Sequence, residues 1–553
     1  MYFSKDKNMF MRNLVLLIIF SFNFSVLAQE ESWFYIRVHE ESVNLNFEEQ
    51  NGHLNYTGED KKLASTLNKY QIKAFKKTYR NAVGPFLKRT YFVISDSKLL
   101  MDDLLIKHSD LFEGGEHILE KDKKIFEPND YGLTSTIGGN QGFNLNLDYL
   151  DFIDAPKAWY YTTGNPKILI GIADGEFDVN DPEFKGKSKR LRASTISKGH
   201  GYTTASLAAA QGDNGYGVPG VCYDCGILAT NYSDLKNYKN LLELSQQGAK
   251  VINCSFGTRT YYETAQEVIN EIYNNGTIIV AAGHNPSWSE TQGEVLYYPA
   301  SYDNVISVSG VMHRYPEPST NIQYEESGSP YAENIRYYVG RTMGFEDRDI
   351  KKAPRIYPIS IANLNPEIDI LAPSVGLFLY ADYHTKKELN MAKYNTTSGS
   401  TPLVSGTVGL MFSLYPCLPH TEVETILKLS ATNIDHIEAN KPYFGHYGAG
   451  ALNTGDAIKM VYQLYNEDEI TEVKNQYFDR WNFKLTTLSK EVQLQNITFE
   501  KEANLNLVAK QSIVLKPGTI LKPNKDSKMH LLINPSISSD CDMQLRDSSI
   551  VEK

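Results

Sequence analysis

Cysteine is scarce in this chain of 553 residues, and the five that occur are at positions 222, 225, 254, 417 and 541. So few thiols exclude a scaffold built on disulfides. Cys222 and Cys225 form a single C-x-x-C pair, whereas a structural zinc site would want a second pair. This pair is therefore a local disulfide or two unreactive thiols. Because the number of cysteines is odd, at least one thiol is free or bonded between chains.

Long apolar runs and long runs of Lys and Arg are also missing after the N-terminus. Without a basic run, and with a formal net charge of −11, the chain does not fit a nucleic-acid partner. At the N-terminus, Lys5, Lys7 and Arg12 precede a short apolar run that closes with small residues at Ala28. This pattern predicts a secretory signal peptide over residues 1–28, and its shortness disfavours the alternative of a membrane anchor. We expect a secreted or cell-surface protein with no transmembrane segment after signal removal.

The pattern of apolar residues divides the rest of the chain into several domains, as its length requires. Residues 29–127 are predicted to form a small α+β domain, and residues 128–144 a linker rich in Gly and Asn. Residues 145–464 form an α/β domain with a polar, Tyr-rich insertion at 312–366. Residues 465–553 are predicted to form a separate β-rich module, for attachment or substrate binding.

Within the α/β domain, short β-branched runs alternate with helix-length segments. Runs that are apolar throughout are typical of a parallel sheet covered by helices on both faces, and the chemistry of such sheets lies at the carboxyl ends of the strands. The predicted strands are residues 168–173, 227–230, 251–254, 277–282, 305–311 and 368–371.

Three segments of this domain each pair a reactive residue with small neighbours, in the order Asp174, His200, Ser398. A serine hydroxyl is a poor nucleophile at neutral pH, so it needs an imidazole to accept its proton and a carboxylate to orient that imidazole. Nucleophile-elbow hydrolases have the order Ser, Asp, His, and no G-x-S-x-G surrounds Ser398. The sequence therefore predicts a catalytic triad of Asp174, His200 and Ser398.

These segments resemble the three blocks of the subtilisin-like serine proteases, or subtilases. The blocks D-T-G-I-D, H-G-T-H-V-A-G and G-T-S-M-A-A-P of that family match residues 174–178, 200–206 and 396–402. Smaller blocks follow in the family's order, including an aromatic-Pro-Ala turn at 298–300 that is often cis. The resemblance covers roughly 320 residues, which is about one domain.

The resemblance implies a subtilisin-like three-layer domain with a central parallel sheet, preceded by a propeptide-like α+β domain and followed by the β-rich module. It also implies a secreted serine endopeptidase, made as a zymogen, that hydrolyses peptide bonds in protein or peptide substrates through an acyl-enzyme. Its own propeptide would act as chaperone and inhibitor; the alternative is a permanent accessory domain. The residues implied to line the substrate pocket are Ser255, Phe256, Gly257, Ala281, Ala282 and Gly283.

The oxyanion donor is where the chain departs most from the family pattern, which has an Asn in A-A-G-N. Here the sequence continues from Gly283 with His284 and Asn285. Strict register assigns the role to His284, whereas a one-residue bulge assigns it to Asn285, and removing such a donor lowers the rate about a hundredfold or more.

Three other departures surround the triad. Thr396 replaces a Gly, Tyr202 and Thr203 replace Thr-His, and Glu176 adds a like charge near the catalytic carboxylate. These departures leave open a catalytically inactive scaffold that binds peptides or surface partners. A serine esterase or peptide ligase would use the same residues.

No cofactor is required by this reading, and no metal is expected at the catalytic residues. The resemblance places a structural calcium loop near Asp213 and Asn214, although most oxygen-rich turns bind nothing.

Overall fold

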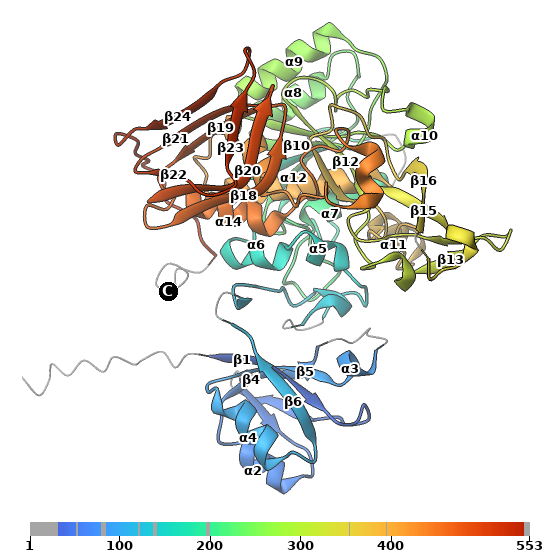
Figure 1. Ribbon diagram of the computed structural model, residues 1–553, viewed down its shortest axis with the longest axis vertical. Coiled ribbons are helices and arrows are strands. Elements are labelled where there is room, and N and C mark those ends of the chain that lie inside the picture. The colour runs from blue at the N-terminus through green and yellow to red at the C-terminus, as the bar shows by residue number, and fades with distance from the viewer. Residues whose placement is uncertain are drawn as a thin grey trace, which may run out of the picture. The chain divides into compact units, whose positions relative to one another are not determined.

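The computed structural model describes residues 31–50, 53–78, 84–119, 122–136, 141–194, 199–352, 354–393 and 395–546. The predicted signal peptide lies outside these residues. The chain divides into two compact units, one ending at Lys123 and one beginning at Lys124 (Figure 1). In the part of the chain described, no helix is both long and apolar enough to cross a membrane.

The first unit is a four-stranded antiparallel sheet, in the order β4-β5-β1-β6, with a separate hairpin of β2 and β3. Alternate residues of β1 are buried, so Phe34, Ile36 and Val38 enter a core shared with α2 and α4, as expected of a sheet with one covered face. The elements are β1 (Ser32–Val38), β2 (Phe47–Gln50), β3 (His53–Tyr56), α2 (Lys61–Leu67), β4 (Ile72–Lys77), α3 (Pro85–Lys88), β5 (Thr90–Ser95), α4 (Leu99–Lys107) and β6 (Phe112–His117).

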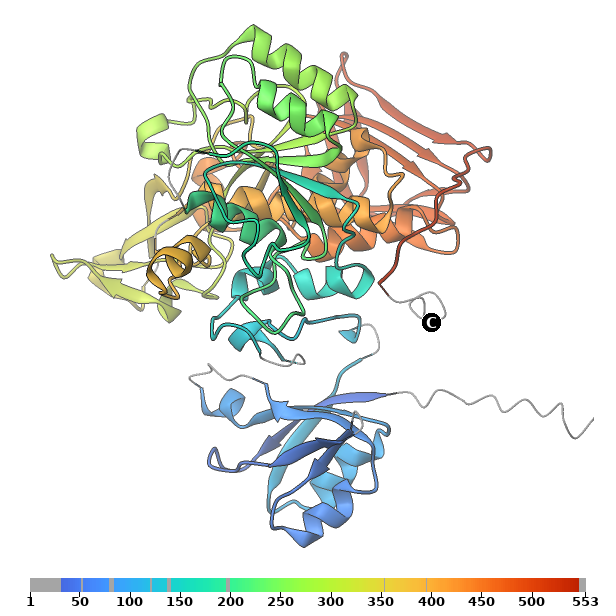
Figure 2. The same ribbon diagram turned by 180° about the vertical axis from the view of Figure 1, so that it is seen from behind.

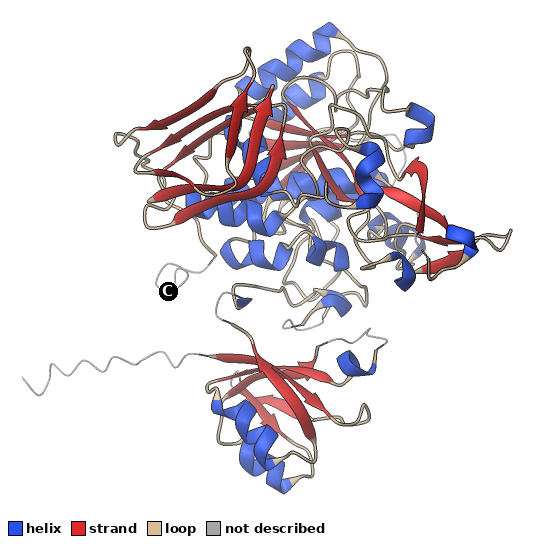
Figure 3. Ribbon diagram, in the orientation of Figure 1, coloured by secondary structure: helices blue, strands red, loops and turns tan. Residues whose placement is uncertain are grey.

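The second unit is built on a seven-stranded parallel sheet in the order β17-β12-β11-β10-β7-β9-β8, with helices on both faces (Figure 3). All six predicted strands are present, with ends shifted by no more than two residues. The strands are β7 (Leu169–Ala173), β8 (Ser188–Arg190), β9 (Gly226–Thr230), β10 (Ala249–Cys254), β11 (Ile278–Ala282), β12 (Val305–Val311) and β17 (Ile370–Pro373).

Helices cover this sheet on both sides, and one of them, α12, is a core helix. In α12 every residue from Gly399 to Leu414 is buried, as expected for a helix that is apolar on all sides. It packs against β10, β11 and β12 of the sheet and against α7 and α14. The helices are α5 (Asp148–Phe152), α6 (Ala155–Tyr161), α7 (His200–Ala209), α8 (Lys239–Gln246), α9 (Glu263–Asn274), α10 (Trp288–Thr291), α11 (Tyr380–Lys386), α12 (Thr397–Leu414), α13 (His420–Ser430) and α14 (Thr454–Leu464).

The strand order reverses between β7 and β10. From β7 the chain adds β8 and β9 on one side of the sheet, and then β10, β11, β12 and β17 on the other. In open parallel sheets the crevice for a ligand forms at the carboxyl ends of the strands at such a reversal. Asp174 directly follows β7 and Ser255 directly follows β10, so both lie at this place.

The insertion at 312–366 contains a four-stranded antiparallel sheet, in the order β13-β14-β15-β16. The sequence showed no period there because two of the strands have only three residues each. The strands are β13 (Ile322–Tyr324), β14 (Pro330–Ala332), β15 (Gly340–Phe345) and β16 (Pro354–Ser360).

The β-rich part after α14 consists of parallel strands and belongs to the same compact unit as the seven-stranded sheet. Neighbouring strands pair in parallel, and paired residues are about 21 positions apart in the sequence. Gln476 pairs with Ile497, and Val492 pairs with Ile513. Figure 2 shows these strands side by side at the C-terminal end of the chain. The strands are β18 (Ile470–Phe478), β19 (Asn482–Thr487), β20 (Glu491–Lys501), β21 (Asn504–Ala509), β22 (Ile513–Leu515), β23 (Ile520–Pro523) and β24 (Met529–Ile533).

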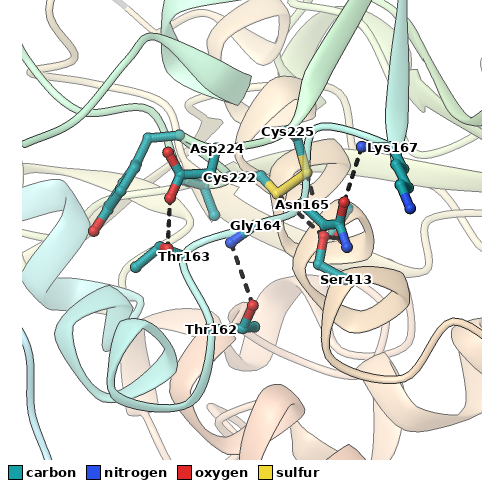
Figure 4. Close-up of a disulfide and its surroundings, with 12 residues drawn as sticks. Thr162, Thr163, Gly164, Asn165, Lys167, Cys222, Asp224, Cys225 and Ser413 are labelled. Atoms are coloured by element: carbon teal, nitrogen blue, oxygen red, sulfur yellow. Dashed lines mark hydrogen bonds between the residues drawn. A yellow bond between two sulfur atoms is a disulfide. The ribbon is translucent and has the colours of Figure 1, made fainter. Parts of the chain in front are cut away.

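Two disulfides link the cysteines, and Cys254 is free and buried. Cys222 and Cys225 form a local disulfide, the first of the two alternatives for this pair, beside Ser413 of α12 (Figure 4). The second disulfide, Cys417–Cys541, joins the segment after β24 to the connection between α12 and α13.

Candidate active site

Asp174 and His200 form a hydrogen-bonded pair at the carboxyl ends of the strands of the parallel sheet. Asp174 is fully buried, and His200 is the first residue of α7. The imidazole Nδ1 lies 2.7 Å from Oδ1 and 3.0 Å from Oδ2 of the carboxylate. Burial opposes charging of the ring, but the hydrogen bond and negative charge of Asp174 outweigh it and raise the pKa of His200 above its usual value. With Nδ1 held this way, Nε2 is the nitrogen available to accept a proton.

Three further groups donate to the Asp174 carboxylate. They are the Gly175 backbone N–H at 2.5 Å, the Thr204 hydroxyl at 3.2 Å and the Tyr232 hydroxyl at 2.9 Å. Thr204 and Tyr232 were not among the site residues predicted from the sequence. The available signals were that Thr204 is one helical turn after His200, and that Tyr232 follows β9, the strand beside β7.

Ser398 is the second residue of α12, where backbone N–H groups have no partner within a helix. Pro402 has no N–H to donate to the Ser398 carbonyl four residues earlier. The Ser255 hydroxyl takes that place and donates to the Ser398 carbonyl at 3.0 Å. The Ser398 hydroxyl in turn donates to the Ser255 carbonyl at 3.3 Å. This exchange fixes the start of α12 against the end of β10.

Ser398 and His200 line the same cavity of about 330 Å³, together with residues of α7, α11 and the start of α12. Within the described residues no hydrogen bond joins the Ser398 hydroxyl to His200. Catalytic hydrogen bonds are often long in unliganded enzymes and shorten when substrate binds. The structure therefore brings Asp174 and His200 into contact and places Ser398 on the same cavity.

The two candidate oxyanion donors, His284 and Asn285, lie in the segment after β11 and differ in conformation and in partners. His284 has a φ of 83°, in the left-handed region that non-glycine residues rarely adopt. Its ring stacks on the ring of Tyr297. Asn285 Oδ1 accepts hydrogen bonds from the backbone N–H and the hydroxyl of Thr397, both at 2.9 Å. With its oxygen bound to the residue before Ser398, the Asn285 amide has its NH₂ group left as a donor.

The six predicted substrate-lining residues lie at the ends of two neighbouring strands. Ser255, Phe256 and Gly257 follow β10. The Phe256 and Tyr232 rings are in contact, with centroids 5.3 Å apart. Ala281 and Ala282 end β11, and Gly283 continues its ladder by donating to the Val308 carbonyl at 2.8 Å. The Tyr298–Pro299 peptide bond is cis, as the resemblance implied for this turn.

The other departures from the family pattern have local partners. Glu176 forms an ion pair with Arg190, and the positive charge of Arg190 neutralises the negative charge that Glu176 adds near the triad. The Tyr202 hydroxyl accepts from the Asp178 backbone N–H at 2.8 Å and lies 2.9 Å from Nε2 of His384. Thr396 is the N-cap residue of α12.

The turn at Asp213 and Asn214 is held by hydrogen bonds to carboxylates. The Asp130 carboxylate accepts from both backbone N–H groups of this turn, and the Asp213 carboxylate accepts from the Asn129 N–H. Calcium needs six to eight oxygen ligands, and no cluster of three or more His, Cys, Asp or Glu suited to a metal occurs in the described ranges. Asp130, Asp213 and Asn214 therefore do not fit a calcium ion as they stand, because the two carboxylates already accept backbone N–H groups.

Comparison with known proteins places this site in a family. Residues 117–450, more than half of the chain, match the model of the subtilase family. The chain is 26% identical over 316 residues to subtilisin DY of Bacillus licheniformis, covering 55% of this chain and 95% of that one. It is 30% identical over 176 residues to a thermophilic serine proteinase of Bacillus sp. strain AK1, covering 28% of this chain and 41% of that one.

Among solved structures, the prenylagaramide maturation protease PagA is 24% identical, with a TM-score of 0.38, over 55% of this chain and 98% of that one. The match of the family model agrees with the parallel sheet and with the order of the three catalytic segments. The chain belongs to the subtilase family, the subtilisin-like serine-type endopeptidases.

Proposed function

We propose that the chain is a secreted endopeptidase that hydrolyses peptide bonds through an acyl-enzyme formed on Ser398. The observation that carries this proposal is the 2.7 Å contact between His200 Nδ1 and Asp174 Oδ1, on the cavity that Ser398 also lines. Protein or peptide substrates follow from the family.

In the first half of the reaction the Ser398 oxygen attacks the carbonyl carbon of the scissile bond, and His200 Nε2 takes the hydroxyl proton. Asp174 stabilises the imidazolium that forms. The Ser398 backbone N–H and the Asn285 NH₂ group donate to the oxyanion of the tetrahedral intermediate. His200 then gives its proton to the leaving nitrogen, and the C–N bond breaks.

The second half repeats these steps with water. His200 takes a proton from water, the hydroxide attacks the acyl carbon, and the ester bond to Ser398 breaks as His200 returns the proton. Each step uses only groups of this chain and the substrate.

For the N-terminal unit we propose a propeptide that helps the catalytic domain fold and inhibits it until maturation. Its position, its size and its α+β fold support this role. Parallel sheets fold slowly because their contacts join distant residues, which gives a removable template a physical purpose. If maturation is autocatalytic, the wild-type chain loses the unit, and the Ser398→Ala variant keeps its full length.

The direct test of the function is hydrolysis of an unfolded protein substrate by the purified chain, with Ser398→Ala as the control. We expect turnover by the wild type and none above background by the variant. A folded wild-type protein without activity would favour the peptide-binding scaffold. Activity limited to small esters would favour the esterase.

A further inference from the structure

Two aromatic side chains fill the space between the two substrate-lining segments. The His284 and Tyr297 rings are stacked, with centroids 4.1 Å apart and planes inclined by 20°. A Cβ added to Gly257 would lie 3.2 Å from the Tyr298 backbone oxygen, 3.4 Å from Cδ2 of His284 and 3.8 Å from Cβ of Tyr297. The first distance is tighter than an ordinary Cβ contact and the other two are van der Waals distances, so the gap between Gly257 and the two rings has room for at most one carbon atom.

The two rings are fixed parts of the fold. Tyr297 is 4% exposed, and its hydroxyl accepts a hydrogen bond from Arg259 Nε at 3.0 Å. The Arg259 guanidinium also lies 5.4 Å from the centre of the Tyr297 ring. The His284 carbonyl accepts from the Asn363 backbone N–H at 3.0 Å. The Tyr297 ring cannot move aside without breaking its hydrogen bond to Arg259, and the His284 ring, whose backbone is fixed by Asn363, is held by its stacking on Tyr297.

The filled space is next to the nucleophile. Asn285, directly after His284, is bonded to Thr397, the residue before Ser398. Gly257 is two residues after Ser255, which exchanges hydrogen bonds with Ser398. The cavity beside His200, by contrast, is lined by residues of α7, α11 and the start of α12. The site is therefore open towards α11 and filled between the two proposed substrate-lining segments.

The chemistry of the pair suits packing rather than recognition of charge. Burial, and then the positive charge of Arg259, lower the pKa of His284, which keeps its ring neutral at physiological pH. A neutral imidazole stacked on a phenol ring carries no charge that could pair with a charged side chain.

We propose that the His284–Tyr297 pair closes the pocket that would hold the side chain of the substrate residue before the scissile bond. Cleavage is then restricted to bonds that follow glycine, alanine or serine. This inference rests on the proposed endopeptidase function and names its substrate class. A leucine or phenylalanine before the scissile bond would have to displace an anchored ring. Each methylene group that a pocket discriminates changes kcat/KM by about 10- to 200-fold, so the preference is expected to be steep.

The test compares peptide anilides that differ only in the residue before the scissile bond, with the full mature chain. We expect kcat/KM for the alanine peptide to exceed that for the phenylalanine peptide by about 100-fold or more. In Tyr297→Ala the phenylalanine peptide should gain about tenfold or more, while the alanine peptide changes little. The matched control is Tyr261→Ala, an exposed tyrosine whose ring contacts Tyr298 and Tyr302.

Two outcomes overturn the inference: equal rates for the two peptides, or a preference of the wild type for phenylalanine. Because Tyr297 is buried and its variant could fail to fold, peptide phosphonates ending in alanine or phenylalanine are also compared on the wild type. A small fluorophosphonate separates the two proposals. If it labels Ser398 while the peptide series shows no preference, only the inference fails; if it does not label the folded chain, the proposed function fails.

Discussion

The Tyr232 hydroxyl donates a hydrogen bond of 2.9 Å to Asp174 Oδ1, the same oxygen that lies 2.7 Å from His200 Nδ1. A neutral donor on this oxygen reduces the negative charge that the imidazole faces. It also fixes the plane of the carboxylate. We infer that Tyr232 is a positioning residue of the Asp174–His200 pair.

Tyr232→Phe is expected to lower kcat by about tenfold, because one hydrogen bond to a charged carboxylate contributes about 1.5 kcal/mol. Without the hydroxyl, more of the Asp174 charge acts on His200, which raises the pKa of His200 further. Since the base must be neutral to accept a proton, the acidic limb of the kcat/KM profile should move to higher pH. The control is Tyr238→Phe, a buried tyrosine whose hydroxyl has no partner among the described residues. An unchanged pH profile in Tyr232→Phe would contradict this role.

Asn285→Ala is expected to lower kcat by about a hundredfold or more with little change in KM, the general effect of losing one oxyanion donor. Asn285→Asp is the sharper variant, because it keeps the oxygen that Thr397 contacts and removes the NH₂ group. Steady-state kinetics on an alanine peptide measure both variants. His284→Ala should retain kcat on that peptide, and the opposite pattern, with His284→Ala the inactive variant, would reject the bulged register.

Replacing Cys417 and Cys541 by serine is expected to destabilise the second unit by about 5 kcal/mol, because the disulfide closes a loop with a sequence separation of 124 residues. Replacing Cys222 and Cys225, only 3 residues apart, should cost about 2 kcal/mol. Guanidinium unfolding followed by tryptophan fluorescence compares the two double variants. Equal destabilisation would show that loop length does not set the contribution of these bonds.

Calcium is expected to have little effect on stability at the Asp213 turn, because Asp130 and Asp213 already accept backbone N–H groups there. The measurement is the Tm in EDTA and in millimolar calcium. Glu183 is the informative residue, since one oxygen of its buried carboxylate has no partner among the described residues. A calcium-dependent rise in Tm that Glu183→Gln abolishes would establish an ion site instead.

The parallel sheet and the order of the catalytic segments could be predicted from the sequence, because both leave local signals. A strand buried on both faces is apolar along its whole length, as in β12, and the residue that follows such a strand lies at the functional edge. This rule predicts that Asp174, which directly follows β7, lies at the functional edge, and it needs no knowledge of the other strands.

Contacts between residues distant in sequence could not be predicted in this way. Tyr232 reaches Asp174 because β9 pairs with β7, and the register of that pairing is not written in either strand. The sequence also left open which of His284 and Asn285 is the oxyanion donor, and the contact that favours Asn285 joins it to Thr397, 112 residues away.

The parallel pairing of the strands after α14 was not predicted, for a related reason. Its partner residues are mostly different in type, and one of its clearer marks is a pair of asparagines. Asn475 and Asn496 both have positive φ, and Asn496 donates to Asn475 at 2.9 Å. Both asparagines lie within strands, in β18 and β20, whereas asparagine in a sequence is typical of a turn.

Labelling by a fluorophosphonate, followed by mass analysis of the labelled peptide, tests the central claim most directly. The account predicts a single adduct on Ser398 of the mature chain, a strongly reduced labelling rate in His200→Ala, and no adduct in Ser398→Ala. Folded wild-type protein that stays unlabelled, or that is labelled on another residue, would contradict the account.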